Sequence, residues 1–183
     1  MYQLNKPFVL WLTGLPCSGK STLAKAIEEE LSVCADFPVK VLDGDEFRSK
    51  FSKDLGFSIE DRHANNLRAA KQAIEIAKTG QAVMVAIVSA YRKTREEIKT
   101  LFEDLIEVYV KCPVETCEDR DVKGMYKKAR EDKIKYFTGV NDPYEEPLNP
   151  DIEVKTHKQN LEECLEVVIN KLEELDYISR GRS

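Results

Sequence analysis

Apolar and polar residues are arranged along this chain in two different patterns. Short runs that are apolar along most of their length predict buried strands, and they lie at 8–12, 39–42, 82–88, 105–110 and around Ile152 and Val154. Runs without a polar face are typical of strands that are covered on both sides. We therefore expect a central sheet with both faces buried.

Between these runs, apolar residues recur at every third or fourth position, which is the spacing of a helix. The predicted helices cover 22–31, 58–80, 94–102, a stretch that Pro113 opens, and 161–175. Ser58, with Asp61 three residues later, is typical of a capped helix start, and Gly80 is a typical stop. Alternating strands and helices predict an α/β fold with a mainly parallel sheet.

Residues 121–150 follow neither pattern. They are charged, contain several glycines and prolines, and hold six basic residues against two acidic ones between Lys123 and Lys135. Such a surplus could close over phosphates, or it could be an ordinary solvated surface. We expect one domain over residues 1–178, with 179–183 as a tail that is disordered or a cloning remnant.

The first strand and the first helix flank a loop with the spacing G-x-x-x-x-G-K-S. Its glycines let the backbone curl so that successive N–H groups point at phosphate oxygens, and the following helix adds its positive N-terminal end. Lys20 can reach the terminal phosphates, and the Ser21 hydroxyl is placed to hold Mg²⁺. The predicted ATP-binding residues are Gly14, Leu15, Pro16, Cys17, Ser18, Gly19, Lys20, Ser21 and Thr22.

Composition narrows the class of protein further. The 183 residues are 42% hydrophobic and 33% charged, as in soluble globular proteins. Five cysteines without a C-x-x-C pair suggest reduced thiols, so we expect a cytoplasmic protein. A net charge of -5 argues against a nucleic-acid partner, and no apolar run approaches the roughly 20 residues that span a bilayer. The oligomeric state is not decided, and a homodimer is one option.

The second predicted strand ends in Asp43-Gly44-Asp45. Beside a phosphate loop, one carboxylate can orient or deprotonate an acceptor hydroxyl while the other helps to hold Mg²⁺. The alternative is a simple turn. The N-K-x-D motif of guanine-nucleotide switches is missing, and motor ATPases are usually longer than this chain. Of the proteins with a phosphate loop, a small-molecule kinase therefore fits the two carboxylates best. Ser89 follows another strand on the same edge of the sheet, where ligands of such folds bind.

Longer motifs point to one family. Asp54-Leu55-Gly56-Phe57-Ser58, followed by Asp61-Arg62 and Asn65, resembles the D-L-G-F-S-x-x-D-R-x-x-N motif of adenylylsulfate kinases (APS kinases). The residues from Arg120 to Arg130, Phe137-Thr138-Gly139 and the stretch from Asp142 to Pro150 also match, in family order. The resemblance runs from Trp11 to about Ile152.

The resemblance implies transfer of the γ-phosphoryl group of MgATP to the 3′-hydroxyl of adenosine 5′-phosphosulfate (APS), giving PAPS, the sulfate donor. It also implies that residues 121–150 form a mobile lid. The implied catalytic residues are Lys20, Asp43, Asp45 and Ser89, with Ser21 and Asp43 at the metal. The implied acceptor contacts are Asp45, Arg48, Phe57, Arg62, Asn65, Ser89, Lys123 and Phe137.

The chemistry of these residues fits their implied roles. Arg48 and Arg62 can hold an anion as forks, and Phe57 offers a face for adenine, although Phe57 and Phe137 could be ordinary core residues. Ser89 has been suggested in this family as a phosphorylated intermediate. With no histidine or other base beside it in the sequence, Ser89 is a weak nucleophile, so we interpret it as an acceptor contact.

The chain departs from the family pattern at three positions. Ala90 and Val122 replace prolines, and Leu67 replaces one of two arginines. The lost arginine leaves open a kinase for another nucleotide 3′-hydroxyl, such as that of a cytidine diphosphate derivative. An inactive binding module on the same fold is a further alternative, against which the intact Lys20 and the two carboxylates argue.

Overall fold

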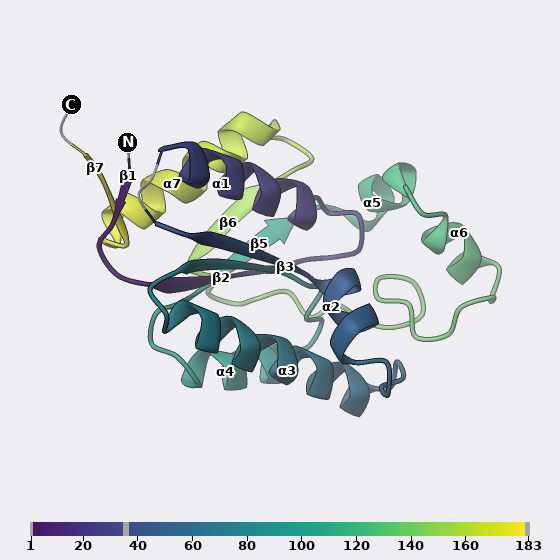
Figure 1. The fold of residues 1–183 in the computed structure, drawn as a ribbon. Coiled ribbons are helices and arrows are strands. Elements are labelled where there is room, and N and C mark those ends of the chain that lie inside the picture. Colours follow the sequence, from purple (N-terminus) through teal and green to yellow (C-terminus); the bar gives the residue numbers. More distant parts are fainter. Residues whose placement is uncertain (1, 35–36, 182–183) are drawn as a thin grey trace.

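A five-stranded parallel sheet forms the centre of the molecule. The computed structural model describes residues 2–34 and 37–181. In space the strands lie in the order β3-β4-β2-β5-β6, and their bounds are β2 (Phe8–Thr13), β3 (Val39–Asp43), β4 (Ala82–Ala86), β5 (Leu105–Lys111) and β6 (Ile152–Lys155). The α/β fold is therefore confirmed, and the loop after β2 leaves the sheet at its middle strand (Figure 1).

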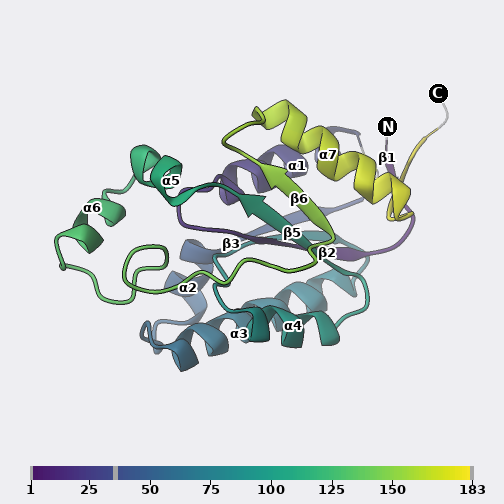
Figure 2. The same cartoon turned by 180° about the vertical axis from the view of Figure 1, so that it is seen from behind.

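Two pairs of helices cover the two faces of this sheet. The helices α1 (Lys20–Cys34) and α7 (Leu161–Glu174) lie on one face, and α3 (Ile59–Ala77) and α4 (Arg92–Thr100) lie on the other (Figures 1 and 2). Alternate residues of β2 point to opposite faces: Leu10 and Leu12 pack in the first core, and Val9 and Trp11 pack in the second. This double burial explains why the strands read as apolar runs.

The structure contains two short helices that the sequence pattern did not predict, α2 (Gly44–Phe51) and α6 (Met125–Arg130). The helix expected after Pro113 is present as α5 (Val114–Arg120). The side chain of Asp43 accepts from the backbone N–H groups of Asp45 and Glu46 and so caps α2. The simple turn considered for Asp43-Gly44-Asp45 is thus a helix start.

The predicted start of α3 is confirmed, with one change in its partners. Ser58 is the N-cap residue, and its side chain accepts from the backbone N–H of Asp61. The Asp61 carboxylate does not close a capping box. It accepts instead from Gly56 N, at 3.0 Å, and so holds the loop before the helix.

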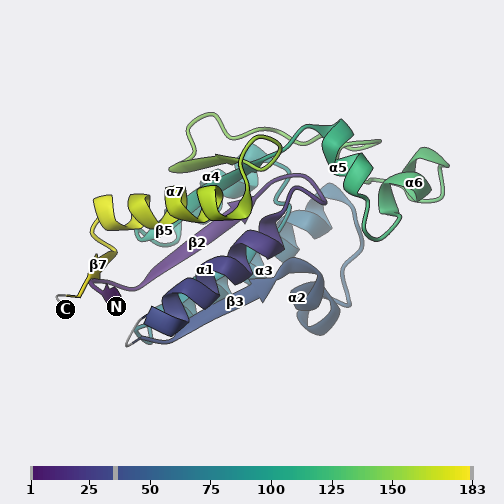
Figure 3. The same cartoon turned by 90° about the horizontal axis from the view of Figure 1, so that it is seen from above.

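The prediction that residues 179–183 form a tail is wrong for the first two of these residues. Ser179 and Arg180 belong to β7 (Ile178–Arg180), which pairs antiparallel with β1 (Tyr2–Leu4). Three-residue strands carry little periodicity, so their pairing is decided by tertiary contacts. Residues 182–183 lie outside the described part of the chain. Seen from above, this two-stranded ribbon lies at the opposite end of the molecule from α5 and α6 (Figure 3).

Residues 121–150, hereafter the lid segment, contain α6 and a long irregular stretch. A third apolar cluster joins this segment to the loop after β2. Tyr126 and Phe137 meet edge to face with ring centroids 4.9 Å apart, and the Tyr126 hydroxyl donates to Pro16 O at 2.9 Å. The lid segment therefore rests on the phosphate loop. In the described part of the chain, no helix is long and apolar enough to cross a membrane.

Candidate active site

The phosphate loop lies between β2 and α1, at the carboxyl edge of the sheet. Gly14 must be glycine here, because a Cβ atom on it would lie 2.5 Å from Val110 O. The ammonium group of Lys20 is buried and donates to Gly14 O at 3.0 Å and Leu15 O at 2.7 Å. Burial lowers the pKa of Lys20 to about 8. Neutral carbonyls hold this cation without balancing its charge, which suits it to receive an anion.

Ser21 and Asp43, the predicted metal pair, lie in direct contact. The Ser21 hydroxyl donates to Asp43 Oδ2 at 2.5 Å, while Asp43 Oδ1 accepts from Asp45 N at 3.0 Å. One hydroxyl and one carboxylate are the protein ligands that Mg²⁺ takes when phosphates and water complete its shell. The residues present therefore fit a nucleotide-bound magnesium ion.

Asp45 faces the lid segment across the cavity. Its carboxylate forms a short ion pair with Lys123, and this contact raises the pKa of Lys123. Both side chains are exposed, so solvent screens the pair and it contributes little to stability. The structure thus brings a predicted acceptor-side carboxylate together with a predicted lid lysine.

Arg48 and Phe57, two of the predicted acceptor contacts, lie against each other. The Arg48 guanidinium lies over the Phe57 ring, 4.2 Å from its centroid, and donates to Leu55 O at 3.2 Å and to Gly56 O. Burial and the neighbouring Arg62 lower the pKa of Arg48. Phe57 is 58% exposed, so the alternative that it is a core residue is wrong.

Arg62 and Asn65 lie one turn apart on α3. Arg62 donates to Phe57 O at 3.1 Å and to Thr138 Oγ1 at 2.5 Å, and it also reaches Tyr136 O in the lid segment. Asn65 is 5% exposed, and its Oδ1 has no hydrogen-bond partner among the described residues. A buried acceptor of this kind is costly unless a ligand supplies a donor.

Ser89 follows β4, where its side chain reaches the cavity. It is buried, and its Oγ lies 3.4 Å from Asn66 Nδ2. An amide group is not a base, so this geometry offers the hydroxyl no proton acceptor of the kind a nucleophile needs.

Phe137 is predicted to be either an acceptor contact or an ordinary core residue, and its position is compatible with both. It is 9% exposed and packs against Tyr126 in the third apolar cluster, yet one side of it lines the cavity.

One cavity of about 1080 Å³ brings the predicted residues together. The predicted residues that line it are Pro16, Cys17, Gly19, Lys20, Ser21, Thr22, Asp43, Asp45, Arg48, Phe57, Arg62, Asn65, Ser89, Lys123 and Phe137. Gly14, Leu15 and Ser18 of the predicted loop lie behind this lining. The Ser18 carbonyl accepts from Thr156 Oγ1 at 2.7 Å, which fixes the loop from outside.

Sequence reasoning missed the end of the cavity that lies beside the phosphate loop and the loop after β6. The cavity there is lined by Arg120, Thr156, Gln159, Asn160, Leu161 and Cys164. Arg120 Nη2 donates to Thr156 O at 2.7 Å, so the end of α5 and the loop after β6 are joined. The available signal was the position of that loop at the carboxyl end of a predicted strand.

Known proteins share both this sequence and this architecture. A family model described as adenylylsulphate kinase matches residues 6–155. The chain belongs to this family. The adenylyl-sulfate kinase of Rippkaea orientalis is 46% identical over 93% of this chain and 94% of its own length, and that of Microcystis aeruginosa is 46% identical over 94% of each. Adenylyl-sulfate kinase activity, an ATP-dependent phosphoryl transfer, is therefore assigned to the chain.

The fold agrees with this family membership. The APS kinase CysC of Mycobacterium tuberculosis, solved in complex with AMPPNP and APS, superposes with a TM-score of 0.87 at 36% identity. The match covers 92% of this chain and 98% of that one.

Proposed function

We propose that this adenylylsulphate kinase transfers the γ-phosphoryl group of MgATP to the 3′-hydroxyl of APS by direct in-line displacement. The observation that carries the proposal is the single cavity, which has a phosphate loop on one side. On the other side it has two arginines, an exposed aromatic face and the unpartnered oxygen of Asn65. A donor and an acceptor nucleotide can thus meet in one enclosed space.

On the donor side, residues 14–22 hold the phosphates of ATP. Lys20 exchanges its two carbonyl partners for phosphate oxygens, whose negative charge favours the protonated amine. Ser21 and Asp43 hold Mg²⁺, which, when bound, neutralises charge on the β- and γ-phosphates. Arg120 and the loop after β6 close the far end of this side.

On the acceptor side, Arg48 and Arg62 bind the phosphosulfate group through charge-assisted hydrogen bonds. Phe57 stacks on the adenine ring, and Asn65 Oδ1 accepts a hydrogen bond from the nucleoside. Phe137 covers the nucleoside from the lid segment.

The two carboxylates at the start of α2 act between these sides. Asp43 orients the attacking 3′-hydroxyl and receives its proton as the new O–P bond forms, while the bond from the γ-phosphorus to the bridging oxygen breaks and ADP leaves. Asp45 leaves Lys123 to contact the acceptor, and Lys123 turns to the phosphates. Ser89 donates a hydrogen bond to the acceptor and forms no phosphoenzyme.

The cysteine usage supports a cytoplasmic location. Cys17, Cys112, Cys117 and Cys164 are free thiols in the structure, as expected in a reducing compartment. Size-exclusion chromatography with light scattering would decide the oligomeric state, for which a homodimer is one option.

The decisive experiment is a substrate panel with products identified by mass. The purified protein, ATP and Mg²⁺ are incubated with APS, with adenosine 5′-monophosphate and with a cytidine diphosphate derivative. We expect a mass increase of one phosphoryl group on APS alone, and no product once Mg²⁺ is chelated. A product from the cytidine nucleotide but none from APS would contradict the proposed acceptor. No product from any acceptor, with ATP still bound, would favour an inactive binding module.

A further inference from the structure

The backbone of Ser89 has a conformation that serine does not favour. Its φ angle is 48°, in the left-handed region that non-glycine residues rarely occupy. Such a conformation persists where surrounding groups determine it, often at functional sites. The Ser89 carbonyl accepts a hydrogen bond from Arg95 Nη1 at 2.5 Å, and Thr13 Oγ1, which donates to the neighbouring Val88 O at 2.7 Å, lies 3.3 Å from it. The Arg95 guanidinium therefore holds the Ser89 carbonyl, and this fixes the backbone of a residue that lines the cavity.

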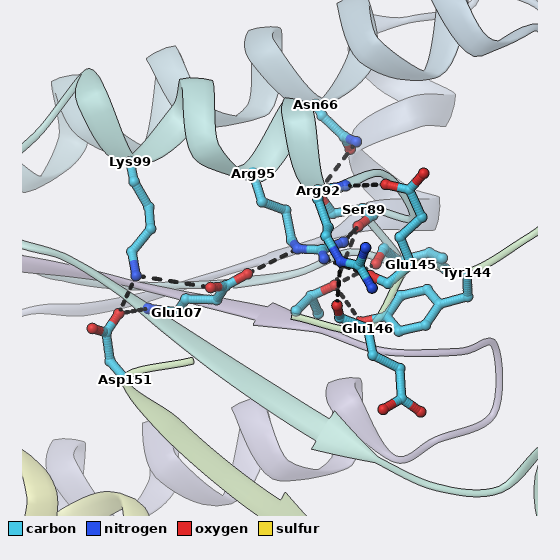
Figure 4. A network of polar contacts seen from close by, with 12 residues as sticks. Asn66, Ser89, Arg92, Arg95, Lys99, Glu107, Tyr144, Glu145, Glu146 and Asp151 are labelled. Carbon is cyan, nitrogen blue, oxygen red and sulfur yellow. Dashed lines mark hydrogen bonds and ion pairs between the residues drawn. The ribbon is translucent and has the colours of Figure 1, made fainter. Parts of the chain in front are cut away.

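Arg95, on α4, joins three separate segments (Figure 4). Its side chain is 3% exposed, and Nε donates to Glu107 Oε1 at 2.8 Å while Nη2 donates to Glu145 O at 2.5 Å. A planar guanidinium has its donors in fixed directions, so it fixes its acceptors relative to one another. Ser89 is one of the residues that line the cavity, whereas Arg95 is not among the described residues that line it. Arg95 therefore acts on the site only through its neighbours.

Glu107, on β5, balances the charge of Arg95. Its side chain is 8% exposed, and Oε2 lies 3.8 Å from Lys99 Nζ, which also pairs with Asp151 at 2.8 Å. Burial raises the pKa of Glu107, while the charges of Arg95 and Lys99 act against that rise. Apolar residues of similar size often stabilise a protein as well as a buried ion pair does. What they lack is the directional bonding that Arg95 gives to Ser89.

The third partner of Arg95 belongs to residues 142–146, the part of the lid segment that returns to the sheet. Glu145 N donates to Ala90 O at 2.9 Å, and the Tyr91 hydroxyl donates to Asp142 Oδ2 at 2.8 Å. That same carboxylate oxygen lies 3.6 Å from Arg62 Nη1. This run of contacts leads from Arg95 to an arginine of the acceptor side.

We propose that Arg95, with its charge balanced by Glu107, is a positioning residue for the acceptor half of the cavity. It holds the Ser89 backbone and the returning residues 142–146 in one arrangement, so that Ser89 Oγ and Arg62 meet APS together. This role rests on the proposed function. It predicts a specific effect on APS and little effect on ATP, because among the described residues the phosphate loop reaches the backbone beside Ser89 only through the long bond from Gly14 N to Val88 O, at 3.4 Å.

The test measures steady-state kinetics of Arg95→Met and Arg95→Lys with ATP and APS varied separately. For Arg95→Met we expect the KM for APS to rise about tenfold or more, since small misplacements of binding groups cost that much. The KM for ATP should change less than about twofold. Lysine keeps the charge but cannot reach three acceptors at once. Arg95→Lys should therefore recover only part of the APS affinity.

A double variant separates positioning from stability. Arg95→Met alone leaves Glu107 buried without its main partner and could fail to fold. Arg95→Met with Glu107→Leu removes both charges, and we expect it to unfold at a temperature near that of the wild type. It should nevertheless keep the raised KM for APS. Lys99→Met is the matched control, because Lys99 touches the same glutamate but not Ser89, and its KM values should stay near those of the wild type.

The outcomes are distinct. A folded double variant with a wild-type KM for APS would overturn the positioning role and leave a purely structural pair. Equal rises in the KM for APS and for ATP would also overturn it. If the wild-type protein makes no product from APS, the proposed function itself fails, and this is seen before any variant is compared.

Discussion

The donor side of the cavity and its acceptor side reach their geometry by different routes. Residues 14–22 are one continuous stretch, made of the loop after β2 and the first residues of α1, and its lysine is held by carbonyls five and six residues away. The acceptor side gathers α2, α3, the end of β4 and the lid segment; the bond from Arg62 to Thr138, for example, spans 76 residues. The phosphate-binding part of the donor side therefore depends on local sequence, whereas the far end of the donor side and the whole acceptor side depend on the packing of the domain.

This difference predicts how substitutions separate the two substrates. Changes on the donor side should affect ATP and turnover together. Changes on the acceptor side should affect APS and leave ATP binding intact.

The largest effect is expected where the two sides meet. Asp43→Asn keeps a side-chain acceptor for the α2 cap but removes the charge that orients the hydroxyl and holds the metal. We expect kcat to fall about 10²-fold or more, with a smaller change in ATP affinity. Glu46→Gln is the control, since Glu46 lies in the same helix but pairs with Lys50. Near-normal turnover of Asp43→Asn would contradict its role.

On the acceptor side, Arg62→Ala removes a charge-assisted fork. The affinity for APS should fall by about 1.5–3 kcal/mol, or roughly 10- to 150-fold, with ATP affinity nearly unchanged. Separate calorimetric titrations of the two ligands measure this. Lys71→Ala, at an exposed position of α3, should change neither affinity. Equal weakening of both ligands by Arg62→Ala would mean that Arg62 only supports the fold.

Ser89→Ala tests whether the acceptor side holds a covalent residue. Loss of one hydrogen bond costs about 0.5–1.5 kcal/mol, so kcat/KM should fall about tenfold at most. Wild-type protein incubated with ATP labelled at the γ-phosphate, without APS, should carry no label. An inactive Ser89→Ala enzyme together with a labelled serine in the wild type would establish a phosphoenzyme instead.

The smallest effect concerns pH and belongs to the donor side alone. Without nucleotide, the pKa of Lys20 is about 8, and the protonated amine is the form that attracts phosphate. ATP affinity should therefore fall as pH rises, by about threefold between pH 7.5 and 8.5. Affinity for APS, titrated without ATP, should stay flat over this range. In Lys20→Arg, which stays charged, the ATP dependence should disappear.

The contrast between the two sides also explains what the sequence could predict. The phosphate loop and the strands around it were predictable because the motif is contiguous and the strands are apolar along their length. Asp43 was recognised as functional, but not as the cap of α2, since a D-G-D stretch fits a turn equally well. Arg95 carried no signal: among 28 lysines and arginines, only the folded structure shows which one is buried beside Ser89.

The lid segment shows the same limit from another direction. Its motifs identified Lys123 and Phe137, yet nothing local indicated that Lys123 would pair with Asp45. Such contacts join residues that are far apart in the sequence. Which of several similar lysines pairs with a given carboxylate therefore depends on how the folded chain brings them together. The loop after β6 was missed for the same reason, because Thr156 and Asn160 form no motif.

The pairing of β1 with β7 has a consequence for protein engineering. Tyr2 and Arg180 are partners in this ribbon, so a short peptide could join the two ends of the chain into a circle. The turn at Gly80 has open space around it and precedes β4, at the edge of the sheet opposite the cavity. A circular permutant opened there would leave the phosphate loop, the stretch with both carboxylates and the lid segment each uncut, although the lid segment would now precede the other two in the chain. Fusion partners attached at the new ends would then lie away from the substrate entrance.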